Sequence, residues 1–182
     1  SSSATGAGGM TLLSTQTASS SSTITFDSGI DSTYKEYIFK YYDVHPSAGV
    51  RLAVNFRDGS TAYDATKTST FFEVYQNEAG TSTSLAYVTD YDLAQSTAVQ
   101  SIGYIGNEND ESCAGTLHLY DPSYTTYVKH YIATTPGYHG SNLALTSRVG
   151  GYCNTTSAID GVQFSMTSGN IDSGTFKMYG VS

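Results

Sequence analysis

The 182-residue chain has no tryptophan, three prolines, two cysteines and only eight lysines and arginines. Two cysteines cannot build a disulfide framework. Eight basic residues against 16 acidic ones form no cluster that would attract nucleic acid or an anionic membrane. No apolar run approaches the roughly 20 residues that span a bilayer, and the first residues lack the basic and apolar parts of a secretion signal. We therefore expect no nucleic acid and no membrane among the partners.

Serine and threonine supply 51 residues, glycine 18 and tyrosine 16, while good helix formers are scarce. Apolar residues make up 38% of the chain and aromatic residues 13%, which suffices for one folded domain of ordinary size. Threonine and tyrosine favour strands, and glycine favours turns. Composition, with a net charge of −8, thus indicates a β-rich protein with an acidic surface and points to no activity.

From Thr23 onward, apolar and polar residues alternate in many short segments. Alternation with period two places one side of a segment against a core, as in half-buried strands. The strand candidates are residues 23–26, 37–42, 50–57, 70–76, 85–88, 98–105, 117–120, 127–133, 162–166 and 176–179. Turn residues separate them, for example Thr135-Pro136-Gly137. This pattern, without a convincing helix, predicts an all-β fold, an antiparallel β-sandwich of the jelly-roll kind.

Residues 1–22 differ from the rest because they consist mostly of serine, glycine, alanine and threonine. We expect them to form an extended N-terminal arm, followed by a β-sandwich domain over residues 23–182. One apolar patch interrupts the arm, and its side chains Met10, Leu12 and Leu13 are the predicted partner-binding residues. A tract of this composition frays unless something holds it, so we expect the arm to lie along a partner's surface.

Motifs for catalysis are missing from the sequence. It has no Gly-Lys-Ser/Thr phosphate loop, no G-x-S-x-G nucleophile turn and no H-E-x-x-H helix. The four histidines are scattered among predicted turns and strands, and nothing positions one of them in a Ser-His-Asp triad. These histidines are His45, His118, His130 and His139.

Two acidic segments remain as candidates for a reaction or a metal. Asp90 and Asp92 have the spacing that places two carboxylates on one strand face, as glycoside hydrolysis requires, although an acidic strand end explains the pair equally well. Residues 107–111 alternate oxygen-bearing side chains but lack the leading Asp, the turn glycine and the distant Glu of a calcium loop, so we expect a solvated loop. The sequence therefore predicts no catalytic residue, no metal, no cofactor and no enzyme.

Two residue types leave alternatives open. Cys113 and Cys153 are not spaced for a zinc site, and we expect two unconnected buried thiols, with a disulfide as the alternative. Tyrosine offers a large contact area and one hydroxyl, which suits an interface or sugar stacking and equally suits cross-strand pairing on a sheet. The candidate tyrosines are Tyr34, Tyr37, Tyr41, Tyr42, Tyr124, Tyr127, Tyr131, Tyr138 and Tyr152.

Several phrases of the sequence occur together in a characteristic order. They are residues 13–20 (LSTQTASS), 24–34 (ITFDSGIDSTY), 37–39 (YIF), 44–47 (VHPS), 159–164 (IDGVQF) and 168–180 (SGNIDSGTFKMYG). With these phrases the chain resembles a family of small structural proteins of tailed phages, especially marine ones, found as capsid-associated or tail-fibre β-sandwich modules. The likeness covers nearly everything after Leu12 and carries no catalytic motif, so it implies no functional residues.

The resemblance implies a virion protein, assembled in the host cytoplasm, that performs no reaction. Usual tail fibres have a long shaft before such a module, whereas only a short arm precedes it here. We therefore expect a capsid decoration (cement) protein that binds the major capsid protein or another virion protein. The alternative is a tail-fibre receptor- or glycan-binding module. We also expect a homo-oligomer, with a trimer as the working hypothesis because capsid lattices present local symmetry axes.

Overall fold

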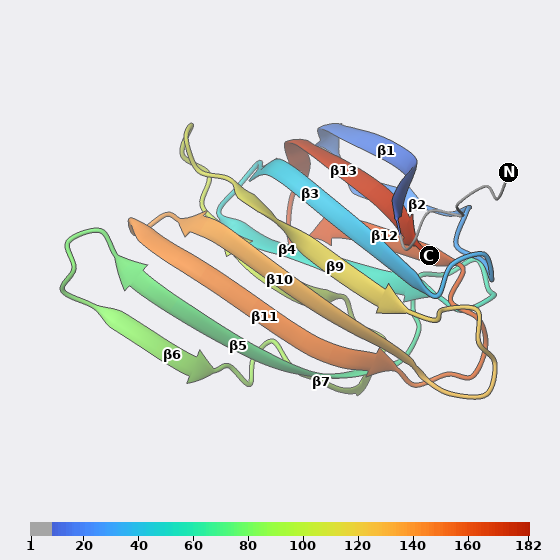
Figure 1. Cartoon of the computed structure of the whole chain (residues 1–182). Coiled ribbons are helices and arrows are strands. Elements are labelled where there is room, and N and C mark those ends of the chain that lie inside the picture. Colours follow the sequence, from blue (N-terminus) through green and yellow to red (C-terminus); the bar gives the residue numbers. More distant parts are fainter. Residues whose placement is uncertain (1–8) are drawn as a thin grey trace, which may run out of the picture.

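The structure, a computed structural model, describes residues 9–182, which form thirteen strands in two sheets (Figure 1). The large sheet has the order β1 (Met10–Ser21), β13 (Ile171–Val181), β3 (Glu36–Pro46), β9 (Cys113–Tyr120), β10 (Lys129–His139), β11 (Leu143–Cys153), β5 (Lys67–Asn77) and β6 (Thr83–Tyr87), and β7 (Leu93–Ser96) also pairs with β5. The small sheet has the order β2 (Thr23–Phe26), β12 (Gly161–Met166), β4 (Val50–Arg57) and β8 (Gln100–Ile105). The predicted all-β antiparallel sandwich is confirmed.

Alternation along β3 shows how the sequence defines two faces of the large sheet. Tyr37, Phe39 and Tyr41 are completely buried, whereas Ile38 and Lys40 between them are partly exposed. The buried set points toward the small sheet, and we call that side the inner face. The opposite side is the outer face. Figure 1 shows the large sheet in front of the small one, with no segment lying across β9, β10 and β11 on the near side.

Aromatic side chains fill the space between the sheets. The ring centre of Phe164, from β12, lies 5.2 Å from that of Phe176 and 5.9 Å from that of Tyr41, both on the large sheet. Phe26 and Phe39 pack against the same ring. Tilted and edge-to-face pairs of this kind contribute about 0.5–1.5 kcal/mol each beyond the burial of the rings. Phe164 is therefore the side chain of the small sheet that makes the most extensive aromatic contacts with the large sheet.

A polar connection holds the sheets together elsewhere. Arg51 of β4 donates hydrogen bonds of 2.7 and 3.2 Å to the carboxylate of Glu73 on β5, and the two side chains are only 11% and 13% exposed. The guanidinium lies 3.6 Å from the centre of the Tyr91 ring, and the Ser147 hydroxyl donates to Glu73 at 2.7 Å. Since both charges are paired and hydrogen-bonded, their burial is tolerated.

The structure corrects the expected N-terminal arm over residues 10–21. β1 pairs with β13 from Met10, opposite Val181, to Ser21, opposite Ile171, and so forms an edge of the large sheet. Ala18 is buried in the core, and threonines elsewhere along the strand suit a pleated edge. Composition suggested a linker because the strand has almost no apolar alternation. Residues 1–8 of the expected arm lie outside the described residues.

Two further strand predictions were wrong. β11 was missed because Gly150 and Gly151 interrupt its pattern, yet a side chain at Gly151 would come within 2.7 Å of the Tyr131 hydroxyl, so only glycine fits. Pro136 was placed in a turn, whereas it lies inside β10. The pairing of β10 with β9 passes from Thr134 directly to Gly137, so the proline lies where that ladder is already interrupted.

Replacing Phe164 by alanine tests the aromatic connection. We expect Phe164→Ala to lower the free energy of unfolding by about 3–5 kcal/mol, because the fully buried ring leaves a cavity between the sheets. Phe72→Ala is the matched control, since its ring is exposed on the outer face, and it should change stability by about 0.5 kcal/mol or less. Urea unfolding followed by far-UV circular dichroism measures both. Equal effects of the two substitutions would contradict this account of the core.

Candidate functional site

The outer face of the large sheet carries most of the large apolar side chains that are exposed. Register pairs show that they share this face: Leu12 lies opposite Tyr179, which lies opposite Ile38, the outward residue of β3. The exposed outer-face side chains are Met10, Leu12, Tyr42, Phe72, Val74, Leu85, Tyr87, Tyr120 and Ile132. An uncovered apolar surface spread over a whole sheet is typical of a face that contacts something.

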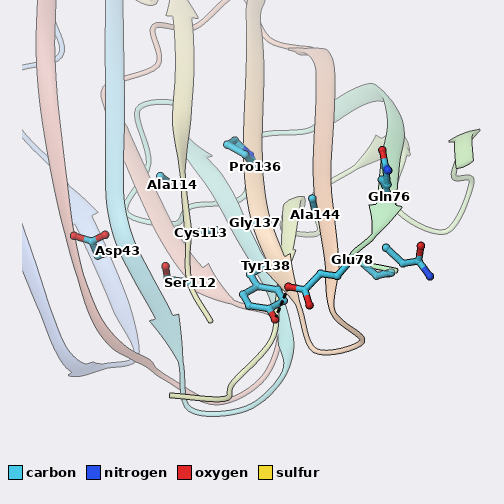
Figure 2. Close-up of a pocket in the computed structure, with 12 residues that line it drawn as sticks. Asp43, Gln76, Glu78, Ser112, Cys113, Ala114, Pro136, Gly137, Tyr138 and Ala144 are labelled. Atoms are coloured by element: carbon cyan, nitrogen blue, oxygen red, sulfur yellow. Dashed lines mark hydrogen bonds between the residues drawn. The ribbon is translucent and has the colours of Figure 1, made fainter. Parts of the chain in front are cut away.

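Two adjoining hollows of about 650 and 570 Å³ lie on this face. They share Gln76 and Ala144, so together they form one trough across the strands, from Asp43 on β3 to Leu85 on β6. We call this the trough. The trough is deep where the side chains that line it are short. Figure 2 shows this at Pro136 and Ala144, which lie between longer side chains.

Polar groups stand at both sides of the trough. The Tyr138 hydroxyl donates a hydrogen bond to Glu78 at 3.1 Å, drawn as a dashed line in Figure 2, and this bond raises the pKa of Tyr138. Asp43 lies on the opposite side, at the β3 bulge, with a left-handed backbone (φ 51°). Among the described residues, the trough contains no nucleophile hydrogen-bonded to a base, which covalent catalysis needs.

The candidate carboxylate pair does not share a strand face. Asp90 and Asp92 lie in the turn between β6 and β7, not on a strand, and neither lines the trough. Asp92 accepts a hydrogen bond of 2.6 Å from the hydroxyl of Tyr87, and this bond raises the pKa of Tyr87. The two carboxylates thus lie between the ends of two short edge strands. This agrees with the simpler interpretation of the sequence, which was an acidic strand end.

Within residues 9–182, no hydrogen bond joins two of the four histidines, although His118 and His130 lie diagonally on neighbouring strands. His118 Nδ1 is 2.6 Å from a carboxylate oxygen of Glu36 on the outer face, and His45 Nδ1 is 2.7 Å from the carbonyl oxygen of Glu111. His139 stacks on Tyr104, with 4.2 Å between ring centres, and its burial there lowers its pKa. No hydrogen bond in residues 9–182 joins a serine hydroxyl to a histidine.

The acidic loop at residues 107–111 is exposed except at its end. Glu111 turns inward, and its carboxylate accepts the backbone N–H of Glu108 at 2.7 Å. Within the part of the chain that the structure describes, no group of three or more His, Cys, Asp or Glu side chains is placed to hold a metal. In the same residues, no helix is long and apolar enough to cross a membrane.

The predicted contact residues divide between core and surface. Leu13 is partly buried and packs against the hydrophobic core, whereas Met10 and Leu12 are exposed on β1. Among the tyrosines, Tyr37, Tyr41 and Tyr131 are buried in the core. Those at least partly exposed are Tyr34, Tyr42, Tyr124, Tyr127, Tyr138 and Tyr152. Sequence alternation distinguishes the two groups only where the strand itself is recognised.

Comparison with known proteins does not identify the chain. It matches no protein-family model and no curated protein. Among solved structures, it overlaps alginate lyase A1-II′, described as a member of polysaccharide lyase family 7, with 16% sequence identity and a TM-score of 0.19. The overlap covers 86% of this chain and 64% of that chain. A likeness this weak supports no argument about function.

Both cysteines are free and buried, which confirms the expected unconnected thiols. Burial raises the pKa of the Cys153 thiol to about 12 and also raises that of Cys113. A raised thiol pKa in the folded state stabilises the protein below the unfolded value of 9.0. That contribution is lost as the pH rises from 9 toward 12.

We therefore expect the free energy of unfolding to fall above pH 9, with Cys153 contributing up to about 1.4 kcal/mol per pH unit. Urea unfolding at several pH values measures this free energy. Above pH 9 it should fall less for Cys153→Ala than for the unchanged chain. The buried tyrosines contribute equally to both proteins, so the difference isolates the thiol. Native Cys153 should also resist alkylation at pH 8, because the thiolate is the reactive form. Rapid alkylation of the folded protein would contradict this.

Proposed function

We propose that the protein is a non-enzymatic virion structural protein of the decoration (cement) kind, which docks on the head surface through the edge strand β1. The partner is the major capsid protein or another virion protein. Two observations support the proposal: the resemblance of the sequence to small tailed-phage structural proteins, and the unprotected edge of the large sheet. The second observation carries the physical argument.

The edge strand β1 is long and unguarded. It runs over twelve residues, pairs with β13 alone among the residues that the structure describes, and contains no charged residue and no proline. Natural sheets usually guard their edges with short strands, charges, prolines or bulges. β1 has one bulge, between Leu12 and Ser14, and leaves Met10 and Leu12 44% and 49% exposed beside the free edge. Such an edge accepts a strand from a partner, with main-chain hydrogen bonds supplying affinity.

Docking of this kind suits a repeated lattice. Each copy would add only a modest interface, but many identical sites on a capsid sum such contacts without any chemistry. The second free edge, β6, also lacks charged residues, so copies of the chain could join one another there. A homo-oligomer, with a trimer as the working arrangement, remains part of the proposal.

Lysines placed on β1 test the docking edge. In Leu12→Lys/Thr17→Lys both altered side chains are exposed in the free protein, so folding should persist. Binding to particles of a tailed phage that encodes this chain, stripped of the protein, should fall at least about tenfold, because an unpaired charge buried in an interface costs several kcal/mol. Co-sedimentation with the particles measures binding.

The matched control is Thr83→Lys/Ala86→Lys, which adds the same charge to the opposite edge strand. Undiminished binding of the β1 variant, or an equal loss in both variants, would contradict docking through β1. Immunogold labelling of intact particles locates the protein independently. Label on the head is expected, label on the tail would favour the receptor- or glycan-binding module, and particles without label would refute a virion role.

A further inference from the structure

The few basic residues of the chain are distributed unevenly. Three of the eight form ion pairs: Lys35 with Asp121, Arg51 with Glu73 and Arg57 with Asp160. Two are buried, Lys67 and Lys129. The other three have no carboxylate partner within the described residues, and they are Lys40, Arg148 and Lys177.

These three cations lie in a single line on the outer face. Lys177 is directly opposite Lys40, and the register continues across the neighbouring strands through two threonines to Arg148. Beyond Arg148 the line ends on two exposed aromatic side chains. In order across seven strands, the line is Lys177, Lys40, Thr116, Thr134, Arg148, Phe72 and Tyr87. We call this the basic row.

The basic row costs stability in the free protein. Like charges directly opposite each other on neighbouring strands are destabilising, and Lys177 and Lys40 are such a pair. Lys40 leans over the Tyr179 ring, with 5.9 Å between Nζ and the ring centre, instead of meeting a carboxylate. In a chain of net charge −8, pairing these cations with acidic side chains would have been simple. An external anion bound between Lys177 and Lys40 would relieve their repulsion.

We infer that the basic row binds an acidic polysaccharide lying across the strands, beside the trough. Strands are about 4.8 Å apart, so the cations extend over roughly 19 Å in total, with Arg148 about 14 Å from Lys40. Between them the Thr116 and Thr134 hydroxyls have no hydrogen-bond partner among the described side chains. Carboxylates, ring hydroxyls and the apolar face of a sugar would meet the cations, the threonines and the terminal aromatics respectively.

The neighbouring register positions belong to the trough. Thr146 and Val74, which line it, lie two residues from Arg148 and Phe72 on the same strands. Sugar rings seated in this part of the trough, whose lining carries no charged side chain, would therefore hold their acidic groups against the basic row. This inference goes beyond docking through β1, because it uses the face of the sheet and leaves the edge free.

Other anionic partners fit the row less well. An extended peptide binds sheets mainly through backbone hydrogen bonds at an edge, and the groups on this face are side chains, since the backbone is paired on both sides. Nucleic acid carries one charge per about 1.7 Å of duplex and is held by many cations. Three cations on an acidic protein are better matched to a polymer with fewer charges per unit length than duplex nucleic acid. At physiological ionic strength, charges more than about 8 Å apart are largely screened from each other. The negative net charge of the whole protein therefore repels the ligand little, and the cations of the basic row determine binding.

Isothermal titration with polygalacturonate tests the inference, with its methyl-esterified form as the matched neutral ligand. We expect binding to the acidic polymer only, weakening as salt is added. Lys40→Gln should weaken binding about threefold and the triple variant Lys40→Gln/Arg148→Gln/Lys177→Gln about thirtyfold, from the usual strength of exposed ion pairs. Lys35→Gln makes the same charge change away from the row and should bind normally.

Four results would overturn the inference. They are no binding to either polygalacturonate or chondroitin sulfate, equal binding to the esterified polymer, equal loss with Lys35→Gln, and tighter binding of oligothymidylate through the same three residues. The last result would assign the row to single-stranded nucleic acid. The β1 variant Leu12→Lys/Thr17→Lys separates this inference from the proposed function, since it should lose particle binding and still bind polygalacturonate.

Discussion

The packing of a narrow sheet against one face of a wide sheet is the constraint on which the rest of this structure depends. Phe164 and the rings around it bury the inner face of β3 and β13, and burial of apolar surface is the dominant favourable term in folding. Within residues 9–182, the four-stranded small sheet packs against one face of the nine-stranded large sheet, and no described segment covers the opposite face. The outer face is left at the surface, where its side chains are free to bind.

Where the aromatic layer ends, polar groups complete the contact between the sheets. Lys67 of β5 is fully buried and donates hydrogen bonds to Asn55 of β4 at 2.5 Å and to the Ala65 carbonyl at 2.7 Å. Burial lowers the pKa of Lys67 to about 8. Such a group is tolerated because its hydrogen bonds are made. The Arg51–Glu73 pair acts similarly further along β5.

Two surfaces of different origin follow from this arrangement. The free edge of β1 offers backbone groups and no charge, whereas the outer face offers side chains with their backbone already paired. The first suits a protein strand, and the second suits a polymer recognised by charge, hydroxyls and ring stacking. Since the two surfaces lie at an edge and on a face of the same sheet, a protein held on a particle by one could still present the other.

The sequence by itself determined the class of fold, because period-two alternation and turn residues are local properties that need no knowledge of the partners of a strand. It also excluded familiar catalytic motifs. It could not identify β1 or β11, since Ser/Thr-rich and glycine-containing strands acquire their conformation from Val181 and Tyr131 across the sheet. The basic row was equally hidden. Lys40, Arg148 and Lys177 are far apart in sequence, and only the strand order and register bring them into line.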